Sequence, residues 1–265
     1  MKKDYTLGVI GGGFMARAIL SGAMAKGILS AEEILVCDPS EDCHTFFTKL
    51  GVDTSHDNHD AVRKSKYLLL AIKPQTFPVV ADELRGEHFP VVISIMAGKT
   101  KTSIRNATGA EKVARVMPNL PCSIGEGMTA VDASELDEAG RNFVLGLFLS
   151  VGEVIETEEG QLNAVTAVSG SGPAYIYLFL RAFIAAAEGQ GLRRDQAEVL
   201  AFQTMEGGLA MAKTSGKSLD ELIAAVSSKG GTTIAALDSF RADGFEESVS
   251  RAVAAAAIRA GELSE

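Results

Sequence analysis

The sequence predicts an α/β protein in two parts, a doubly wound parallel sheet followed by an all-helical domain. Up to about Leu162, short apolar runs alternate with helical patterns, which is typical of βαβ units. These runs are too apolar for half-exposed strands and favour a sheet that is covered on both faces. Beyond Leu162 only helical patterns follow. We therefore expect one domain at residues 1–162 and a second at residues 163–265.

The strands of the first part are expected where the apolar runs lie. In chain order they are Tyr5–Ile10, Ile34–Cys37, Tyr67–Ile72, Val91–Met96, Val113–Met117 and Met128–Val131, with a further one near Val154. Helical patterns lie between them and are clearest over Met15–Lys26 and Asp42–Leu50.

The second part is predicted to contain helices only, separated by glycine-containing stops. They are expected over Ala174–Glu188, Arg194–Thr214, Ser218–Val226, Thr233–Phe240 and Phe245–Gly261. The first of these is hydrophobic nearly all round between Ala174 and Ile184, and such a helix must be buried on every side. A small helical domain has few ways to bury it alone, so we expect self-association as a dimer.

Composition limits the classes of function. The chain has 265 residues, 46% of them hydrophobic and 22% charged, as in an ordinary globular protein. A net charge of −9 argues against a nucleic-acid partner, which needs a basic face. No stretch approaches the roughly 18 apolar residues of a membrane span. We expect a cytoplasmic protein with a small-molecule substrate and no membrane partner.

Cysteine and histidine usage gives no sign of a metal site or a disulfide framework. Cys37, Cys43 and Cys122 are odd in number and lack a CxxC spacing. His56 and His59 lie in a polar stretch that is more typical of a surface loop than of a metal site. We expect no metal.

The N-terminus superficially resembles a signal peptide, because lysines precede an apolar run. Glycines at residues 11–13 and Arg17 interrupt that run too early for an h-region. We therefore expect no cleaved leader.

A glycine cradle follows the first predicted strand. Gly11, Gly13 and Ala16 fit the G-x-G-x-x-G/A fingerprint of a Rossmann-type nucleotide-binding domain. The first glycine makes the tight turn, the second lets a pyrophosphate approach the backbone, and the small alanine lets helix pack on strand. With Gly12, Phe14 and Met15, this segment is the predicted start of a dinucleotide site.

Asp38 at the end of the second predicted strand bears on the choice of coenzyme. A carboxylate there accepts hydrogen bonds from ribose hydroxyls, which suits NADH and repels the 2′-phosphate of NADPH. No arginine stands beside it, and Ser40 is a further candidate contact. The alternative interpretation is an Asp-Pro turn in which Asp38 caps the next helix.

Residues at the carboxyl ends of later strands are expected to line the ligand crevice. The candidates for cofactor contact are Ala71, Ile72, Lys73, Pro74, Ala97, Gly98, Asn119 and, before them in the chain, Asn58. Lys73 can reach a phosphate or a substrate carboxylate, and its alternative interpretation is a solvated lysine at a strand end.

The segment Val226–Ile234 predicts an anion-binding loop. Serines and a lysine lead into Gly230 and Gly231, and Thr232 and Thr233 then begin a helical pattern. Glycines allow consecutive N–H groups to converge, and a helix start favours a carboxylate or a phosphate. The alternative is a serine/threonine cap after a glycine turn.

Together these segments resemble the pyrroline-5-carboxylate reductase family over essentially the whole chain. The motifs that carry the resemblance are the cradle, Ala71–Pro74, Arg115–Asn119, Gly125–Thr129, Ala164–Tyr175, Ser228–Ile234 and Arg259–Leu263. The resemblance implies a Rossmann domain, a C-terminal helical dimerisation domain and, in some members, decamers. It implies hydride transfer from NADH or NADPH to the ring C=N of 1-pyrroline-5-carboxylate, the last step of proline biosynthesis.

The resemblance also assigns roles in the loop. Ser228 and the N–H groups of Gly230, Gly231, Thr232 and Thr233 are implied to bind the substrate carboxylate. The Thr233 hydroxyl is implied to hydrogen-bond the ring nitrogen. No histidine stands at a motif position that suits a general acid, so Thr233 is the best donor available.

Three departures from the family pattern bear on substrate and coenzyme. Lys229 stands where proline is usual, Leu120 where threonine is common, and Asp38 near the usual place of an Asn-Arg-Ser phosphate binder. The first two can mark altered substrate handling or a paralogue that has drifted from proline synthesis, and the third puts NADPH preference in question.

Two other functions remain as alternatives. A β-hydroxyacid dehydrogenase requires a lysine on the helix that enters the second domain, and Ser169–Pro173 contains none. A non-catalytic, cofactor-sensing dimer is the other.

Overall fold

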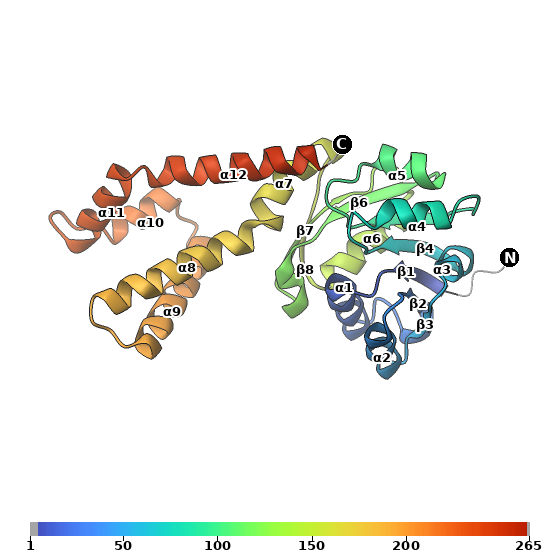
Figure 1. Ribbon diagram of the computed structural model, residues 1–265. Coiled ribbons are helices and arrows are strands. Elements are labelled where there is room, and N and C mark those ends of the chain that lie inside the picture. Colours follow the sequence, from blue (N-terminus) through green and yellow to red (C-terminus); the bar gives the residue numbers. More distant parts are fainter. Residues whose placement is uncertain (1–4, 264–265) are drawn as a thin grey trace. The chain divides into compact units, whose positions relative to one another are not determined.

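The computed structural model describes residues 5–263. Within that range one eight-stranded sheet has the order β3-β2-β1-β4-β5-β6-β7-β8. Its strands are β1 (Tyr5–Ile10), β2 (Ile34–Cys37), β3 (Asp53–Ser55), β4 (Ser65–Leu70), β5 (Val91–Ser94), β6 (Val113–Met117), β7 (Gly127–Asp132) and β8 (Gly152–Glu156). The first six positions follow the Rossmann order, so the predicted fold class is confirmed (Figure 1).

Helices cover both faces of this sheet, as Figure 1 shows. One core contains apolar side chains of α1 (Phe14–Ala25), α2 (Glu41–Lys49) and α6 (Glu138–Leu149). The other contains those of α3 (Asn58–Lys64), α4 (Phe77–Glu83) and α5 (Lys101–Thr108). The strands supply both cores because successive side chains point to opposite faces. In β4, for example, Leu69 belongs to the first core and Leu68 to the second.

The sheet differs from the prediction in several details, among them the end of β5, which lies at Ser94 and not at Met96. β3 was not predicted, because its three residues Asp53–Ser55 are polar and carry no apolar pattern. β6 and β7 are antiparallel, since the chain between them contains only the short 3₁₀ helix Leu120–Ile124 and no crossover helix. β4 ends at Leu70, so Ala71 and Ile72 already belong to the following loop.

The chain forms two compact units. Unit 1 comprises the residues up to Pro173 together with those from Ala256 onward, and unit 2 comprises Ala174–Ala255. The division at residue 162 that the sequence suggests follows the end of the strands. Contacts instead assign the connecting segments Glu159–Gln161, Leu162–Val165 and Thr166–Gly170 to unit 1, with the end of the last helix.

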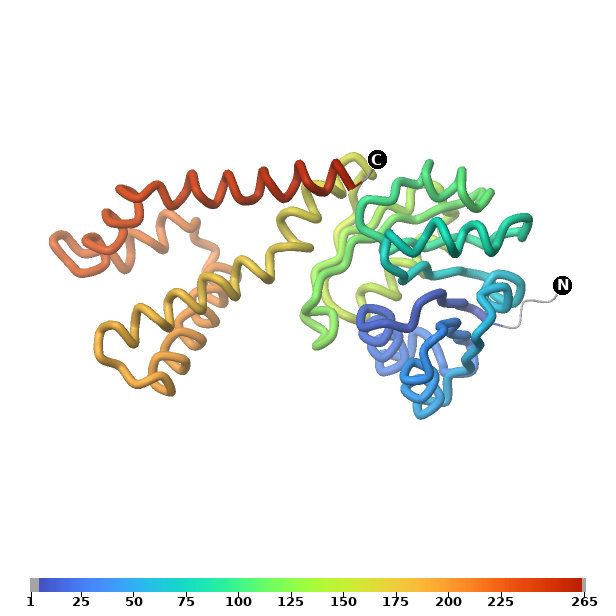
Figure 2. The backbone as a smooth tube through the Cα atoms, viewed as in Figure 1, coloured from blue at the N-terminus to red at the C-terminus, as the bar shows by residue number. Residues whose placement is uncertain are grey.

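The helices of the second part are α8 (Gly172–Gly189), α9 (Arg194–Thr214), α10 (Leu219–Ala225), α11 (Thr232–Ala242) and α12 (Phe245–Glu262). Figure 2 shows α8 and α9 running back along each other as a hairpin. Their shared core is small and consists of Ile184, Ala197 and Ala201.

Much of the apolar surface of α8 stays exposed in the single chain. The exposed side chains are Ile176, Tyr177, Leu178, Phe179 and Phe183. This is the helix whose sequence is apolar nearly all round, and its exposed side chains leave a large apolar surface for another subunit to cover. Among residues 5–263, no helix is both long enough and apolar enough to cross a membrane.

Candidate active site

The turn after β1 has the backbone that the glycine fingerprint predicts. Gly11 has φ 96°, and a Cβ there would lie 2.8 Å from the carbonyl oxygen of Ala71. Gly12 lies against α2, where a Cβ would come within 1.9 Å of the Cys43 sulfur. A side chain at either position would push the turn away from β4 or α2.

The N-terminus of α1 is open. Gly13 is its N-cap and makes no side-chain cap, and a Cβ there would meet no atom within 4 Å. No acidic residue lies in the first turn, where Phe14 is exposed and Met15 is half-buried. The unpaired N–H groups and the helix dipole therefore favour an anion, so this end fits a pyrophosphate.

Asp38 joins this turn to the next one. One carboxylate oxygen accepts a hydrogen bond from the Gly12 N–H at 2.8 Å, and the other accepts from the Ser40 N–H at 2.8 Å. Ser40 is the N-cap of α2. The turn interpretation of Asp38 thus has a structural basis, and each oxygen keeps a lone pair for a ribose hydroxyl.

Two further loops lie at the carboxyl edge of the sheet. After β4, Ala71 and Ile72 are half-buried beside Gly11, and Pro74 is half-buried. Lys73 is exposed. After β5, Ala97 is half-buried and Gly98 is buried with φ 74°.

Two predicted cofactor residues have protein partners. Asn119 donates to the carbonyl and the hydroxyl of Ser169 at 3.2 and 3.3 Å, and accepts from the Met128 N–H at 2.9 Å. Its amide therefore joins β7 to the helical segment Thr166–Gly170. Asn58 donates to both carboxylate oxygens of Glu83 at 3.3 and 3.1 Å.

The anion-binding loop lies in unit 2. Gly230 has φ 71°, and the Gly231 N–H donates to the Ser228 carbonyl at 2.9 Å. Gly231 is the N-cap of α11, with no side-chain cap, so Thr232 and Thr233 are the first two residues of the helix. Neither threonine fills the cap position. This start of α11 therefore offers N–H groups to an anion, and the Thr233 side chain is half-buried beside them.

A buried charged cluster near the β5–α5 loop was missed by the sequence analysis. The Lys101 ammonium pairs with Asp132 at 2.7 Å, and both side chains are almost fully buried. The Lys101 N–H and the Arg115 guanidinium both donate to Glu159 Oε1, at 2.7 and 3.2 Å. Burial opposes ionisation of Asp132, but hydrogen bonds from Lys101 and Ser134 outweigh it and lower the pKa of its carboxyl. Charged residues are usually exposed, so the local sequence did not predict that these charged side chains lie together in a buried cluster.

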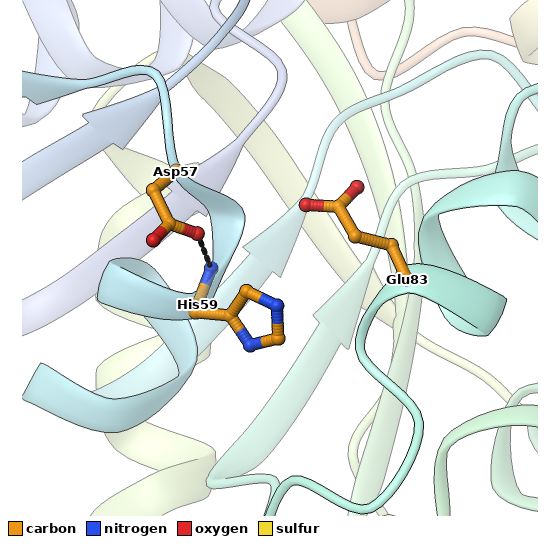
Figure 3. Close-up of side chains that lie close together, drawn as sticks. All are labelled: Asp57, His59 and Glu83. Atoms are coloured by element: carbon orange, nitrogen blue, oxygen red, sulfur yellow. Dashed lines mark hydrogen bonds between the residues drawn. The ribbon is translucent and has the colours of Figure 1, made fainter.

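Asp57, His59 and Glu83 place ligand-type atoms within 4.8 Å of one another (Figure 3). Each already has a protein partner. Asp57 accepts from the His59 N–H, His59 Nδ1 lies 2.7 Å from Glu87 Oε1, and Glu83 accepts from Asn58. With two of its three members exposed, this cluster supports no metal assignment.

Comparison with known proteins identifies the family. Residues 159–263 match the model for pyrroline-5-carboxylate reductase dimerisation, and residues 6–98 match the NADP oxidoreductase, coenzyme F420-dependent model. Pyrroline-5-carboxylate reductase from Pisum sativum is 35% identical over 267 residues, covering 100% of this chain and 98% of its own. The Synechocystis enzyme of the same name is 38% identical over 260 residues, covering 97% of each. The chain belongs to the pyrroline-5-carboxylate reductase family.

Solved structures agree with this membership. A pyrroline-5-carboxylate reductase from Coxiella burnetii superimposes with a TM-score of 0.87 at 35% identity, covering 99% of this chain and 100% of that one. The Plasmodium falciparum pyrroline carboxylate reductase with NADP bound has a TM-score of 0.87 at 28% identity, with complete coverage of both chains. The family resemblance seen in the sequence is thereby confirmed, and the dimerisation model spans the exposed apolar helix α8.

Proposed function

We propose that this chain is a pyrroline-5-carboxylate reductase, which reduces the ring C=N of 1-pyrroline-5-carboxylate to give L-proline. The observation that carries the proposal is the uncapped start of α11 at Gly231, within the segment 159–263 that matches the family's dimerisation model. An uncapped helix start with two threonines is suited to a small carboxylate.

A nicotinamide coenzyme fits the residues of unit 1. The open N-terminus of α1, with Gly11, Gly12, Gly13, Phe14 and Met15, would hold the pyrophosphate. Asp38 and Ser40 would face the adenine ribose, and Asn58 and Ala71–Pro74 would line the same edge. Ala97, Gly98 and Asn119 would lie by the nicotinamide. When bound, the reduced coenzyme supplies a hydride.

The loop at α11 would bind the substrate. Ser228 and the N–H groups of Gly230, Thr232 and Thr233 would hold the carboxylate, which fixes the ring. The Gly231 N–H was predicted to join them, but it already donates to the Ser228 carbonyl and would brace the loop instead. Hydride addition to a neutral imine leaves negative charge on nitrogen, so a donor to that nitrogen stabilises the transition state. The Thr233 hydroxyl would be this donor. Lys229, exposed beside Ser228, adds positive charge next to the carboxylate.

NADH would be preferred to NADPH. Asp38 would place a carboxylate near the 2′-position, where a phosphate is repelled. The presence of NADP in the Plasmodium structure concerns that protein, which is 28% identical.

Self-association of this family member would bury the apolar side chains of α8. A dimer is the minimum assembly, and a decamer built from five dimers is the larger form that the resemblance suggests. Residues 1–162 would serve the coenzyme and residues 163–265 the substrate and the dimer. A cytoplasmic location rests on the sequence alone.

Steady-state reduction of 1-pyrroline-5-carboxylate with NADH and with NADPH tests the proposal. Turnover with proline as product is the expected result. Coenzyme binding without turnover of any cyclic imine would instead indicate a cofactor-sensing dimer. Oxidation of a β-hydroxyacid would indicate the rival dehydrogenase.

A further inference from the structure

The loop between β5 and α5 is fixed at both of its ends. At the start, the Ile95 N–H donates to the Leu70 carbonyl at 3.2 Å, and the Met96 N–H donates to the Ser94 hydroxyl at 3.3 Å. At the end, the Lys101 N–H donates to Glu159 at 2.7 Å. Ala97 and Gly98, in the middle of the loop, lie between these bonds.

The middle of the loop lies against the last turn of the described chain. A Cβ on Gly98 would lie 2.6 Å from the Leu263 carbonyl oxygen, 2.8 Å from its carbonyl carbon and 3.1 Å from its Cβ. Leu263 is held in place in turn, because its N–H donates to the Arg259 carbonyl at 3.1 Å. The approach is between two backbones, so it tolerates no side chain at residue 98.

This contact lies within one compact unit. Residues from Ala256 onward group with unit 1, although the preceding part of α12 belongs to unit 2. Ala260 is buried, and the side-chain nitrogen of Asn163 lies 3.9 Å from where a Cβ of Gly261 would be. The end of α12 therefore packs against the rest of unit 1.

We propose that the turn Gly261–Leu263 is a positioning element for the coenzyme. It covers Gly98 and holds Ala97 and Gly98 in the shape that receives the nicotinamide. The inference rests on the proposed function, because it takes these two residues as the nicotinamide loop. Leu263 itself touches no reacting atom and acts through Gly98.

A matched pair of glycines tests the contact. Gly98 and Gly109 have φ of 74° and 73°, so alanine meets the same backbone strain at both. A Cβ at Gly109 meets no atom within 4 Å, whereas one at Gly98 meets Leu263. We expect Gly98→Ala to raise the coenzyme Kd roughly three- to thirty-fold, the range for residues that act on a site through a packed neighbour. Gly109→Ala should leave the Kd within about twofold of the wild type.

A second experiment, on a shortened chain, shows whether Gly98→Ala weakens coenzyme binding through contact with Leu263 or through contact with the coenzyme itself. A chain that ends at Glu262 should itself bind coenzyme more weakly, roughly three- to thirty-fold, and should lower kcat. In the shortened chain Gly98→Ala should raise the coenzyme Kd little further, because Leu263, which the methyl group would meet, has been removed. An equal cost of Gly98→Ala in both chains would mean that the methyl group meets the coenzyme, or that backbone strain at a φ of 74° alone deforms the loop, and either result overturns the proposal. Unchanged Kd and kcat in the shortened chain overturn it as well.

The Kd is measured without substrate, by calorimetry or by the change in the reduced coenzyme's own fluorescence on binding, since the chain has no tryptophan. The result therefore does not depend on turnover of 1-pyrroline-5-carboxylate. If the wild type binds coenzyme and reduces no imine, the proposed function fails while this contact is still tested.

Discussion

The Asp38 carboxylate accepts a hydrogen bond of 2.8 Å from the main-chain N–H of Gly12. The acid at the end of β2 thus holds the glycine turn at the end of β1, and its second oxygen holds Ser40. Two parallel strands that are neighbours in the sheet bring these residues together. Asp38 therefore braces the cradle as well as being the proposed contact to the ribose.

The two roles of Asp38 predict two separable effects of Asp38→Asn. The amide keeps one acceptor oxygen and loses the other, so coenzyme binding should weaken for NADH. Removal of the negative charge should at the same time relieve repulsion of a 2′-phosphate. We expect the wild type to prefer NADH in kcat/KM, and the ratio of NADH to NADPH to fall roughly tenfold or more in the variant.

Asp42→Asn is the matched control for the coenzyme ratio. Asp42 is exposed and pairs with Arg17, whose Nε donates to the Gly12 carbonyl at 3.2 Å. Its neutralisation removes one negative charge close by and leaves the bond from the Gly12 N–H to Asp38 in place. A wild-type enzyme that strongly prefers NADPH would show that the loop backbone and Ser40 outweigh Asp38.

Leu178 on α8 tests the dimer. Leu178 is 57% exposed in the single chain, and Leu149 on α6 is 54% exposed in unit 1. If α8 is covered by a second copy, Leu178→Glu places a charge in an apolar interface and should yield monomers or insoluble protein. Leu149→Glu should leave the assembly unchanged. Light scattering on dilute protein measures the mass, and a stable, active wild-type monomer would rule the dimer out.

Local patterns predicted the fold and the cradle because the residues that decide them are close in sequence. Gly11, Gly13 and Ala16 lie close together in the sequence. The spacing of apolar residues predicts the strand before them and the helix after them. β3 was not predicted, because Asp53–Ser55 has no apolar pattern. Pairing with the rest of the sheet makes this segment a strand, although its composition does not predict one.

Contacts between distant residues could not be predicted. Lys101 and Glu159 are 58 positions apart, and the sequence near either residue does not predict contact with the other. The same holds for Gly98 and Leu263. Asn119 was predicted from its place at a strand end, which is correct for β6, but its amide is bound to Ser169 and Met128. Position along a strand fixes where a side chain begins and leaves its partner undetermined.

The position of Thr233 in α11 allows its proposed catalytic role to be tested separately from a role in capping the helix. Gly231 is the N-cap of α11, so loss of the Thr233 hydroxyl removes no cap. Thr233→Ala should lower kcat by roughly one to two orders of magnitude, as for a positioned proton donor or hydrogen bond. Thr233→Ser should recover much of the rate. Coenzyme Kd should stay within about twofold, since the cradle lies in unit 1.

Measuring kcat, coenzyme Kd and Tm for both Thr233 variants decides between the roles. A stable Ala variant at the wild-type rate ends the catalytic assignment. A lower Tm with kcat intact would give Thr233 a structural role only.

Glu87 gives unit 1 a stability that depends on pH. Its carboxylate accepts hydrogen bonds from the Arg63 guanidinium, which lower its pKa most, and lies 2.7 Å from His59 Nδ1. These contacts lower the pKa of Glu87 from about 4.5 to about 2. Because the folded state binds this proton less readily than the unfolded chain, the contribution is complete above the ordinary value and is lost as pH falls toward about 2.

Glu87→Gln should therefore lower Tm at pH 7, and the difference from wild type should shrink as the pH falls from about 5 to about 3. Thermal melts across that range, on both proteins in the same buffers, give the measurement. Glu32→Gln, a neutralised acid on the surface of the same unit, controls for the change in net charge. If Glu87→Gln and Glu32→Gln keep the same Tm at every pH, the contacts of Glu87 with Arg63 and His59 contribute nothing to stability. A Tm difference that stays constant down to pH 3 would mean that packing of the side chain, and not its charge, is what the substitution removes.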